Sequence, residues 1–153
     1  MPLLLVRHAH AGNRSSWVGN DVIRPLSPRG MQQAFAIADE LAAYGPTRVL
    51  SSGHTRCRQT VEPLAGRLGL AVEVEPRLRE ATRPADSLAL VDELAGQTAV
   101  LCSHGDVIPD ILDGLIGRGM VVDGETHWQK GSVWVLEHAG RHWTRGKYLP
   151  APC

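Results

Sequence analysis

Short apolar runs alternate with amphipathic segments along this chain. Leu3 to Val6 is a continuous apolar run, typical of a strand buried on both faces. After a polar loop, Ser27 is a candidate helix N-cap and Pro28 follows it at the first helical position. Apolar residues then recur at helical spacing until Gly45-Pro46. The pattern predicts a strand followed by a helix.

The same alternation continues through the rest of the chain. We expect strands at residues 49–51, 71–74 and 98–102, and helices at 54–68, 86–94 and 107–116. The helix at 54–68 is expected to be disturbed around Pro63, because a residue that precedes proline is pushed from helical geometry. Residues 132–137 and 142–148 flank a turn containing Gly140 and predict a hairpin. The predicted fold is a three-layer α/β/α sandwich with a mostly parallel sheet and a C-terminal hairpin, in a single domain over residues 1–153.

The composition indicates which binding partners and which cellular compartment to expect. Sixteen Lys plus Arg balance sixteen Asp plus Glu, so no overall field favours a nucleic acid polymer or an anionic membrane. The apolar run before Arg7 is too short for a signal peptide or a membrane span. Cys57, Cys102 and Cys153 are odd in number and show neither a disulfide framework nor a zinc-site spacing. We therefore expect a cytoplasmic protein with no nucleic acid or membrane partner.

Basic residues follow three of the predicted strands. The first strand ends in Arg7-His8, the second leads into the segment that holds Arg56, and the strand at 98–102 leads into His104-Gly105. The carboxyl ends of parallel strands meet at one edge of a sheet, where ligands bind in such folds. Backbone amides at the starts of the helices near 54 and 105, Gly105 included, add donors and positive helix dipole. The sequence therefore predicts a cationic pocket for a phosphate.

His8 is the candidate nucleophile in this pocket. Attack on phosphorus needs a neutral imidazole, and neighbouring arginines favour that form. His104 would donate a hydrogen bond or charge to the phosphoryl oxygens. Asn13 and Arg14, in the loop after the first strand, are candidate substrate-binding residues.

A metal site is the main chemical alternative, with His8, His10, His54 and His104 as imaginable ligands. The arginines would repel a cation, and no acidic cluster is apparent nearby in the sequence. We expect neither a metal nor a cofactor. Cys57 is interpreted as a packed helix cysteine, and Trp128, Trp134 and Trp143 as residues that cover the core.

Four ordered segments resemble the histidine phosphatase superfamily, also called phosphoglycerate-mutase-like. They are Leu5-Val6-Arg7-His8-Ala9, Leu26 to Ala34, Ser51-Ser52 with Arg56 to Thr60, and Cys102-Ser103-His104-Gly105. Two longer segments, Arg56 to Ala65 and Gly105 to Asp110, resemble the phosphatase domain that follows the Nudix domain in some nucleotide hydrolases. The chain is also similar in kind to the small bacterial phosphohistidine phosphatases.

The resemblance implies a role for each matching residue. It makes His8 the phosphorylated nucleophile, with Arg7, Arg56 and His104 binding the phosphoryl group. Glu80, in Leu78-Arg79-Glu80, is the implied proton donor. The chain departs from the usual pattern at Ala9, at Ser52-Gly53, and after Glu80, where the glycine- and tryptophan-rich sequence of many members is absent.

The expected function is hydrolysis of a phosphomonoester, of a small metabolite or a nucleotide, through a phosphohistidine on His8. One alternative is a protein phosphohistidine phosphatase, because small single-domain members of the superfamily act on such proteins. The other is a non-catalytic phosphate-binding module. A mutase is less favoured, because only Pro76 to Pro84 looks free to cap the site.

Overall fold

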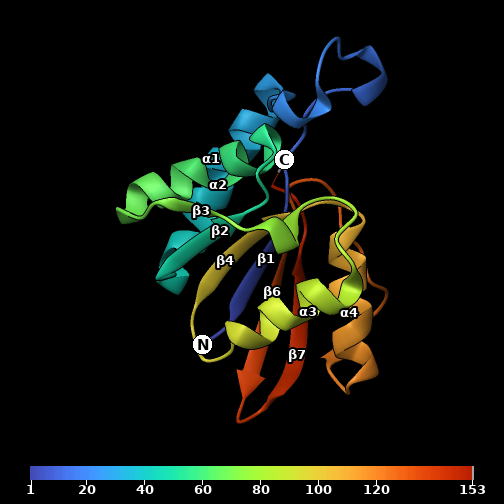
Figure 1. The fold of residues 1–153 in the computed structure, drawn as a ribbon. Helices are drawn as coiled ribbons and strands as arrows, with labels where there is room; N and C mark the ends of the chain where they lie inside the picture. The colour runs from blue at the N-terminus through green and yellow to red at the C-terminus, as the bar shows by residue number, and fades with distance from the viewer. Residues whose placement is uncertain (153) are drawn as a thin grey trace.

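A computed structural model describes residues 1–152 as one mixed sheet with helices on both faces (Figure 1). Within these residues the sheet has seven strands in the order β3-β2-β4-β1-β6-β7-β5. The strands are β1 Leu3–Arg7, β2 Arg48–Ser51, β3 Val72–Val74, β4 Ala99–Ser103, β5 Val121–Val122, β6 Val133–Ala139 and β7 His142–Leu149. The α-helices are α1 Pro28–Leu41, α2 Thr55–Leu68, α3 Pro84–Glu93 and α4 Val107–Gly117. Four short 3₁₀ turns complete the described part: η1 Arg14–Ser16, η2 Asp21–Ile23, η3 Ala42–Tyr44 and η4 Pro76–Leu78.

The central strand β1 shows how the layers form. Leu3 and Leu5 pack into a core cluster with residues of α3 and α4, whereas Leu4 and Val6 pack with residues of α1 and α2. All four side chains are buried, so a continuous apolar run meets a helical layer on each face. The predicted three-layer α/β/α fold with a mostly parallel sheet is confirmed.

Local signals explain where the first two helices begin and end. Ser27 Oγ accepts a hydrogen bond from Gly30 N at 3.1 Å, so Ser27 caps α1 as expected. The helix α2 runs without a break through Pro63, contrary to the expected disturbance. Proline costs one amide donor, but the buried face of α2 holds the helix together until Gly69 ends it in the left-handed conformation.

The C-terminal hairpin is confirmed, with β6 and β7 antiparallel and a register shift at Glu137/His138. Other boundaries moved by one or two residues, and α3 begins at Pro84, ahead of the expected start at 86. The short strand β5 was not predicted, because two residues carry no periodic signal; it pairs in parallel with β7. Trp134 and Trp143 belong to the core, as expected, and Trp128 packs against it.

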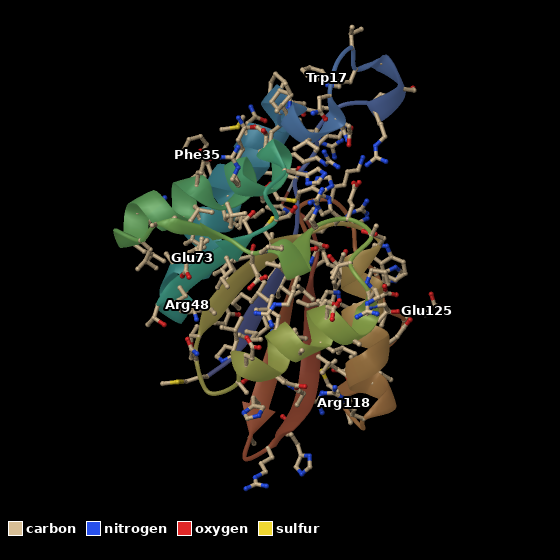
Figure 2. All side chains as sticks on the ribbon, in the orientation of Figure 1. Trp17, Phe35, Arg48, Glu73, Arg118 and Glu125 are labelled. Atoms are coloured by element: carbon tan, nitrogen blue, oxygen red, sulfur yellow. The ribbon has the colours of Figure 1, made fainter. Side chains whose placement is uncertain are left out.

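The register brings the expected basic residues to one edge of the sheet. Arg7 pairs with Ser103 across β1 and β4, and Ser51 pairs with Cys102 across β2 and β4. The loops that follow these strands therefore begin side by side. The loop between β1 and α1 protrudes from the body beyond this edge, with Trp17 on it (Figures 1 and 2).

At the opposite side of the sheet from the hairpin, Arg48 and Glu73 form a cross-strand ion pair on β2 and β3 (Figure 2). Within residues 1–152, no helix has the length and apolar character needed to cross a membrane. Cys57 and Cys102 are free and buried.

Candidate active site

His8 lies directly after β1 and is only 5% exposed. Its Nδ1 is 2.9 Å from the carbonyl oxygen of Ala9, so this nitrogen carries the proton and donates it there. That tautomer leaves Nε2 with its lone pair, and His8 lines the cavity of the site. Burial, with smaller contributions from the charges of Arg56 and Arg7, lowers the pKa of His8 to about 3. The neutral form expected from the sequence is supported, but burial is a larger cause than the arginines.

Arg7 is fixed beside His8 by two close contacts. Its Nη1 donates to the Trp128 carbonyl at 2.7 Å, in the loop before β6. The guanidinium also lies against Gly105, where a Cβ would come within 2.6 Å of Nη2. The Nε of Arg7 is buried without a hydrogen-bond partner among the described residues. Because buried donors are normally satisfied, this N–H is an exception among the described residues.

His104 follows β4 and is almost fully buried. Its Nε2 lies 2.8 Å from Ser52 Oγ, which is also 3.2 Å from His54 Nδ1. The rings of His8 and His104 meet edge to face, with centroids 5.5 Å apart. Burial lowers the pKa of His104 to about 2, with smaller contributions from His8 and Arg56. His104 is therefore a neutral hydrogen-bonding group in the unliganded site.

Arg56 lies in the first turn of α2 and has no exposed surface. Its Nη1 donates to the backbone carbonyl of Asp21 at 3.0 Å, and its Nη2 lies 3.2 Å from Asp21 Oδ2. The same Nη2 donates to Glu80 Oε1 at 2.6 Å. Arg56 Nε is another buried donor without a partner within residues 1–152. The guanidinium is thus buried with its charge directed at two carboxylates.

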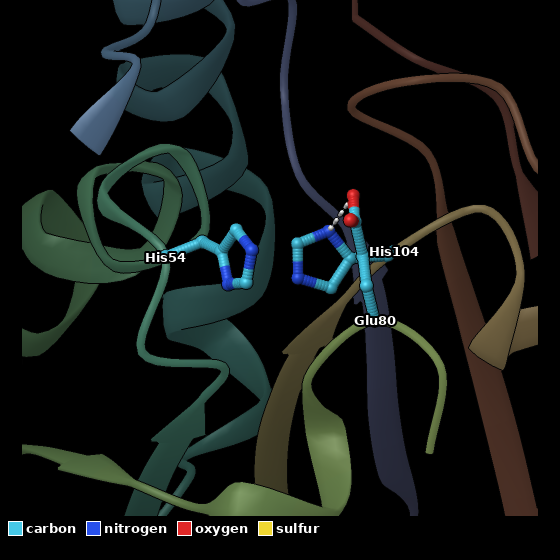
Figure 3. A group of neighbouring side chains, drawn as sticks. All are labelled: His54, Glu80 and His104. Atoms are coloured by element: carbon cyan, nitrogen blue, oxygen red, sulfur yellow. Dashed lines mark ion pairs between the residues drawn. The ribbon is translucent and has the colours of Figure 1, made fainter. Parts of the chain in front are cut away.

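Glu80 follows η4 and contacts the positive groups of the site. Its Oε1 accepts from Arg56 Nη2 and from Arg14 Nη2, each at 2.6 Å. The same oxygen lies 3.4 Å from His104 Nδ1, and Figure 3 shows this contact. The expected candidate proton donor therefore lies in the pocket, in contact with three of its cationic or imidazole groups.

The segment around Glu80 is tied down on both sides. Leu78 is fully buried, and its carbonyl accepts from Ser103 Oγ. Ala81 N donates to Asp106 Oδ2 at 2.8 Å, and Ala81 has φ 65°, the sole positive φ of a non-glycine residue in the described part of the chain. Such a conformation persists where surrounding contacts enforce it. Glu80 is held between these two anchors.

A cavity of about 580 Å³ connects these groups. Its lining contains most of the expected site residues and several that the sequence did not single out: Arg7, His8, Gly12, Arg14, Arg24, Glu80, Ala81, His104, Gly105, Asp106 and Lys130. Neither Asn13 nor Arg56 lines it. Asn13 Oδ1 accepts from Ser15 N and caps the turn η1, whereas Arg56 is fully buried and contacts Glu80 of the lining. Arg24 is buried, and its Nε donates to Asp21 Oδ1 at 2.9 Å. No motif marked Arg24 or Lys130, because loop packing alone places them here.

His54, Glu80 and His104 also form a group whose potential metal-ligating atoms lie within 4.8 Å of one another (Figure 3). The expectation that no nearby acidic cluster compensates the arginines was wrong, because Glu80 and Asp21 both contact Arg56. The Glu80 oxygen nearest the imidazoles is already shared by Arg14 and Arg56. Two guanidiniums at this distance oppose a cation there.

Known proteins are similar to this chain in sequence and in fold. A family model described as histidine phosphatase superfamily (branch 1) matches residues 3–84. An 8-oxo-(d)GTP phosphatase of Mycolicibacterium smegmatis is 38% identical over 155 residues, covering 98% of this chain and 48% of that protein. The chain spans about half the length of the curated relatives it matches.

Solved structures agree with the fold. The protein histidine phosphatase SixA, complexed with tungstate, superposes with a TM-score of 0.73 at 25% identity, covering 90% of this chain and 88% of that one. A mycobacterial glucosyl-3-phosphoglycerate phosphatase gives a TM-score of 0.71 at 22% identity, covering 96% of each chain. The second likeness bears on the fold alone.

Proposed function

Because the chain belongs to the histidine phosphatase superfamily, we propose that it hydrolyses a phosphomonoester through a phosphohistidine on His8. The observation that carries the proposal is the tautomer of His8. Its Nδ1 donates to the Ala9 carbonyl, so the Nε2 lone pair is available to attack a phosphorus atom in the cavity. With a pKa of about 3, the imidazole is neutral throughout the physiological range.

Two arginines support a phosphoryl group in front of His8. Arg7 lines the cavity beside His8, and Arg56 contacts Glu80, which lines the same cavity. Phosphoryl oxygens are strong acceptors for guanidinium groups. Arg7 and Arg56 would hold the equatorial oxygens, and His104 would contribute an N–H.

The reaction follows in two displacements. His8 Nε2 forms a bond to phosphorus while the bond from phosphorus to the ester oxygen breaks, and the leaving oxygen takes a proton from a protonated Glu80. Water then attacks the phosphohistidine, loses a proton to Glu80, and releases phosphate with cleavage of the P–N bond. The sum is one ester plus one water giving one alcohol plus one phosphate. Arginines that stabilise developing charge on the phosphoryl oxygens accelerate both steps.

Substrate binding would change the partners of Glu80. In the structure its Oε1 accepts hydrogen bonds from the Nη2 atoms of Arg56 and Arg14. A phosphoryl dianion competes for those donors and repels the carboxylate. Glu80 would then turn toward the leaving oxygen, to which it would pass a proton.

We favour a small phosphorylated metabolite or a nucleotide as the substrate. The relative in Mycolicibacterium smegmatis is named for action on 8-oxo-(d)GTP. The cavity is larger than a phosphate alone requires and is rimmed by loops. We treat residues 1–153 as a single phosphatase domain, and the free thiols of Cys57 and Cys102 favour a reducing, cytoplasmic setting.

A phosphohistidine protein is the second candidate substrate. It is favoured by the likeness to the protein histidine phosphatase SixA, which extends over 88% of that chain. A non-catalytic phosphate-binding module is the alternative outside enzymes. Hydrolysis of an aryl phosphate separates them: turnover that is lost in His8→Ala supports an enzyme, whereas phosphate binding without turnover by the unmodified protein supports a module.

A further inference from the structure

Lys130 lines the active-site cavity, and hydrogen bonds of the following residue, Gly131, hold its backbone in place. The amide of Gly131 lies 3.1 Å from the carbonyl oxygens of both Arg7 and His8. Arg7 also donates to the carbonyl of Trp128, two residues before Lys130. These contacts join the loop before β6 to the end of β1. The position of Lys130 beside His8 is therefore fixed by main-chain geometry.

The Lys130 ammonium has no hydrogen bond or ion pair with any residue from 1 to 152. Burial lowers its pKa, and Arg7, Arg24 and two further arginines lower it further. Each of these charges is positive. A cation held among cations without a counter-ion is stabilised by an anionic ligand.

Lys130 also lines a second cavity. Its volume is about 390 Å³, and its lining consists of His10, Arg29, Gln33, Gln129, Lys130 and Ala151. No carboxylate side chain is among these lining residues. Lys130 lines both cavities, so the two share this side chain as a common wall.

Arg29 supplies a second unpaired cation in that cavity. It lies in the first turn of α1, and its side chain makes no hydrogen bond or ion pair in the described part of the chain. The neighbouring Gly30 packs closely against the His10 backbone, because a Cβ at Gly30 would come within 1.9 Å of the His10 carbonyl oxygen. Burial lowers the pKa of His10, and the positive charges of Arg29 and Lys130 lower it further. Both cations therefore act on His10.

We propose that Lys130 and Arg29 form a second anion subsite, which binds a second phosphate on a substrate whose reacting phosphoryl group lies at His8. The inference rests on the proposed function for the reacting end of that substrate. It names the substrate class: a phosphomonoester that carries a further phosphate or phosphonate group. The two anions would lie on either side of Lys130, one in each cavity.

Two series of alkyl phosphates test this subsite. In one series the far end of the chain is a hydroxyl, and in the other it is a phosphonate, which is not hydrolysed; chains from propyl to hexyl are compared at matched length. We expect kcat/KM for the phosphonate series to exceed that for the hydroxyl series by about tenfold at the best length, from one added charge-assisted contact. Lys130→Met and Arg29→Met should each reduce that ratio toward one.

Lys147→Met is the matched control. Lys147 is exposed on β7 and lines none of the described cavities, so its loss removes the same charge without touching the subsite. The ratio should be unchanged in this variant. An equal effect of Lys147→Met would show a general field effect and overturn the proposal, as would the absence of any preference in the unmodified protein.

A binding measurement keeps this inference separate from the proposed function. If neither series is hydrolysed, the proposed function fails, and calorimetry with alkyl phosphonates then tests the subsite alone. A bisphosphonate that binds about tenfold more tightly than the monophosphonate of equal length, and loses that advantage in Lys130→Met, supports the subsite. Equal affinities would overturn it.

Discussion

Glu80 Oε1 and Arg56 Nη2 lie 2.6 Å apart in the active site. Arg56 is completely buried, and Glu80 reaches it from a segment anchored by Asp106. In the proposed reaction a phosphoryl oxygen would compete with this carboxylate for Arg56. The pair links the two halves of the proposed chemistry, because the arginine proposed to bind the phosphoryl group also contacts the proposed proton donor.

We expect Glu80→Gln to slow hydrolysis of an alkyl phosphate far more than that of an aryl phosphate. An alkoxide needs a proton to leave, whereas a phenolate departs more readily, and general acid catalysis contributes about 10²- to 10⁴-fold. Initial rates with both esters provide the measurement. Glu73→Gln, on the exposed pair with Arg48, is the matched control. Equal small losses on both esters would remove Glu80 from the chemistry and favour a phosphohistidine substrate.

Gly105→Ala should displace the Arg7 guanidinium. A Cβ there would lie 2.6 Å from Arg7 Nη2 and 2.8 Å from Cζ, so the arginine must move. We expect kcat/KM to fall by about tenfold or more, the effect of losing one charge-assisted hydrogen bond. Gly117→Ala is the control, because nothing lies within 4 Å of its Cβ. Unchanged kinetics in Gly105→Ala would argue against a role for Arg7 in binding the phosphoryl group.

Asp21 is predicted to act as a positioning residue. Its carboxylate contacts Arg24 at 2.9 Å, Arg56 at 3.2 Å and Arg14 at 3.5 Å. Asp21→Asn should raise KM and the inhibition constant of inorganic phosphate together, each by about tenfold, because the guanidiniums lose their common anchor. Asp123→Asn removes an exposed ion pair with Arg145 and should change neither constant. A loss confined to kcat would contradict a positioning role.

The protein should become less stable in acid because His8 is buried in its neutral form. The pKa of His8 is about 3 in the folded protein and about 6.5 in an unfolded chain. Between these values the unfolded chain binds more protons, so this contribution is complete above pH about 6.5 and declines as the pH falls. From about pH 7 to about pH 5, His8 alone should remove about 2 kcal/mol from the free energy of unfolding.

Urea denaturation of the unmodified protein and of His8→Asn measures this term. All other titrating groups are common to both proteins, so the variant should lose less stability across the same pH range. Parallel losses in the two proteins would show that His8 is protonated in the folded state, and would contradict the buried neutral imidazole.

The sequence was most informative where function depends on strand ends. The apolar run of β1 predicted a strand buried on both faces, and the ends of β1 and β4 fixed where His8 and His104 would emerge. Parallel strands must place their carboxyl ends on one edge, so topology alone brought these residues together.

Residues supplied by loops could not be located in the same way. Lys130 reaches the site because Gly131 bonds to the backbone of Arg7 and His8, far away in the sequence. Arg24 is placed by its contacts with Ala11 and Asp21. Such contacts leave no periodic pattern, so the charge balance of the pocket became visible only in three dimensions.

The proposed reaction requires a covalent phosphate on His8, which rapid quench with an aryl phosphate labelled at phosphorus detects. Protein stopped within the first turnover, kept at alkaline pH and digested should carry the label on the peptide that contains His8. The bond should be acid-labile, as a phosphoramidate is, and the label should be absent from His8→Asn. Label on Cys57, a serine or His104, or full turnover without any labelled protein, would show that His8 is not the nucleophile.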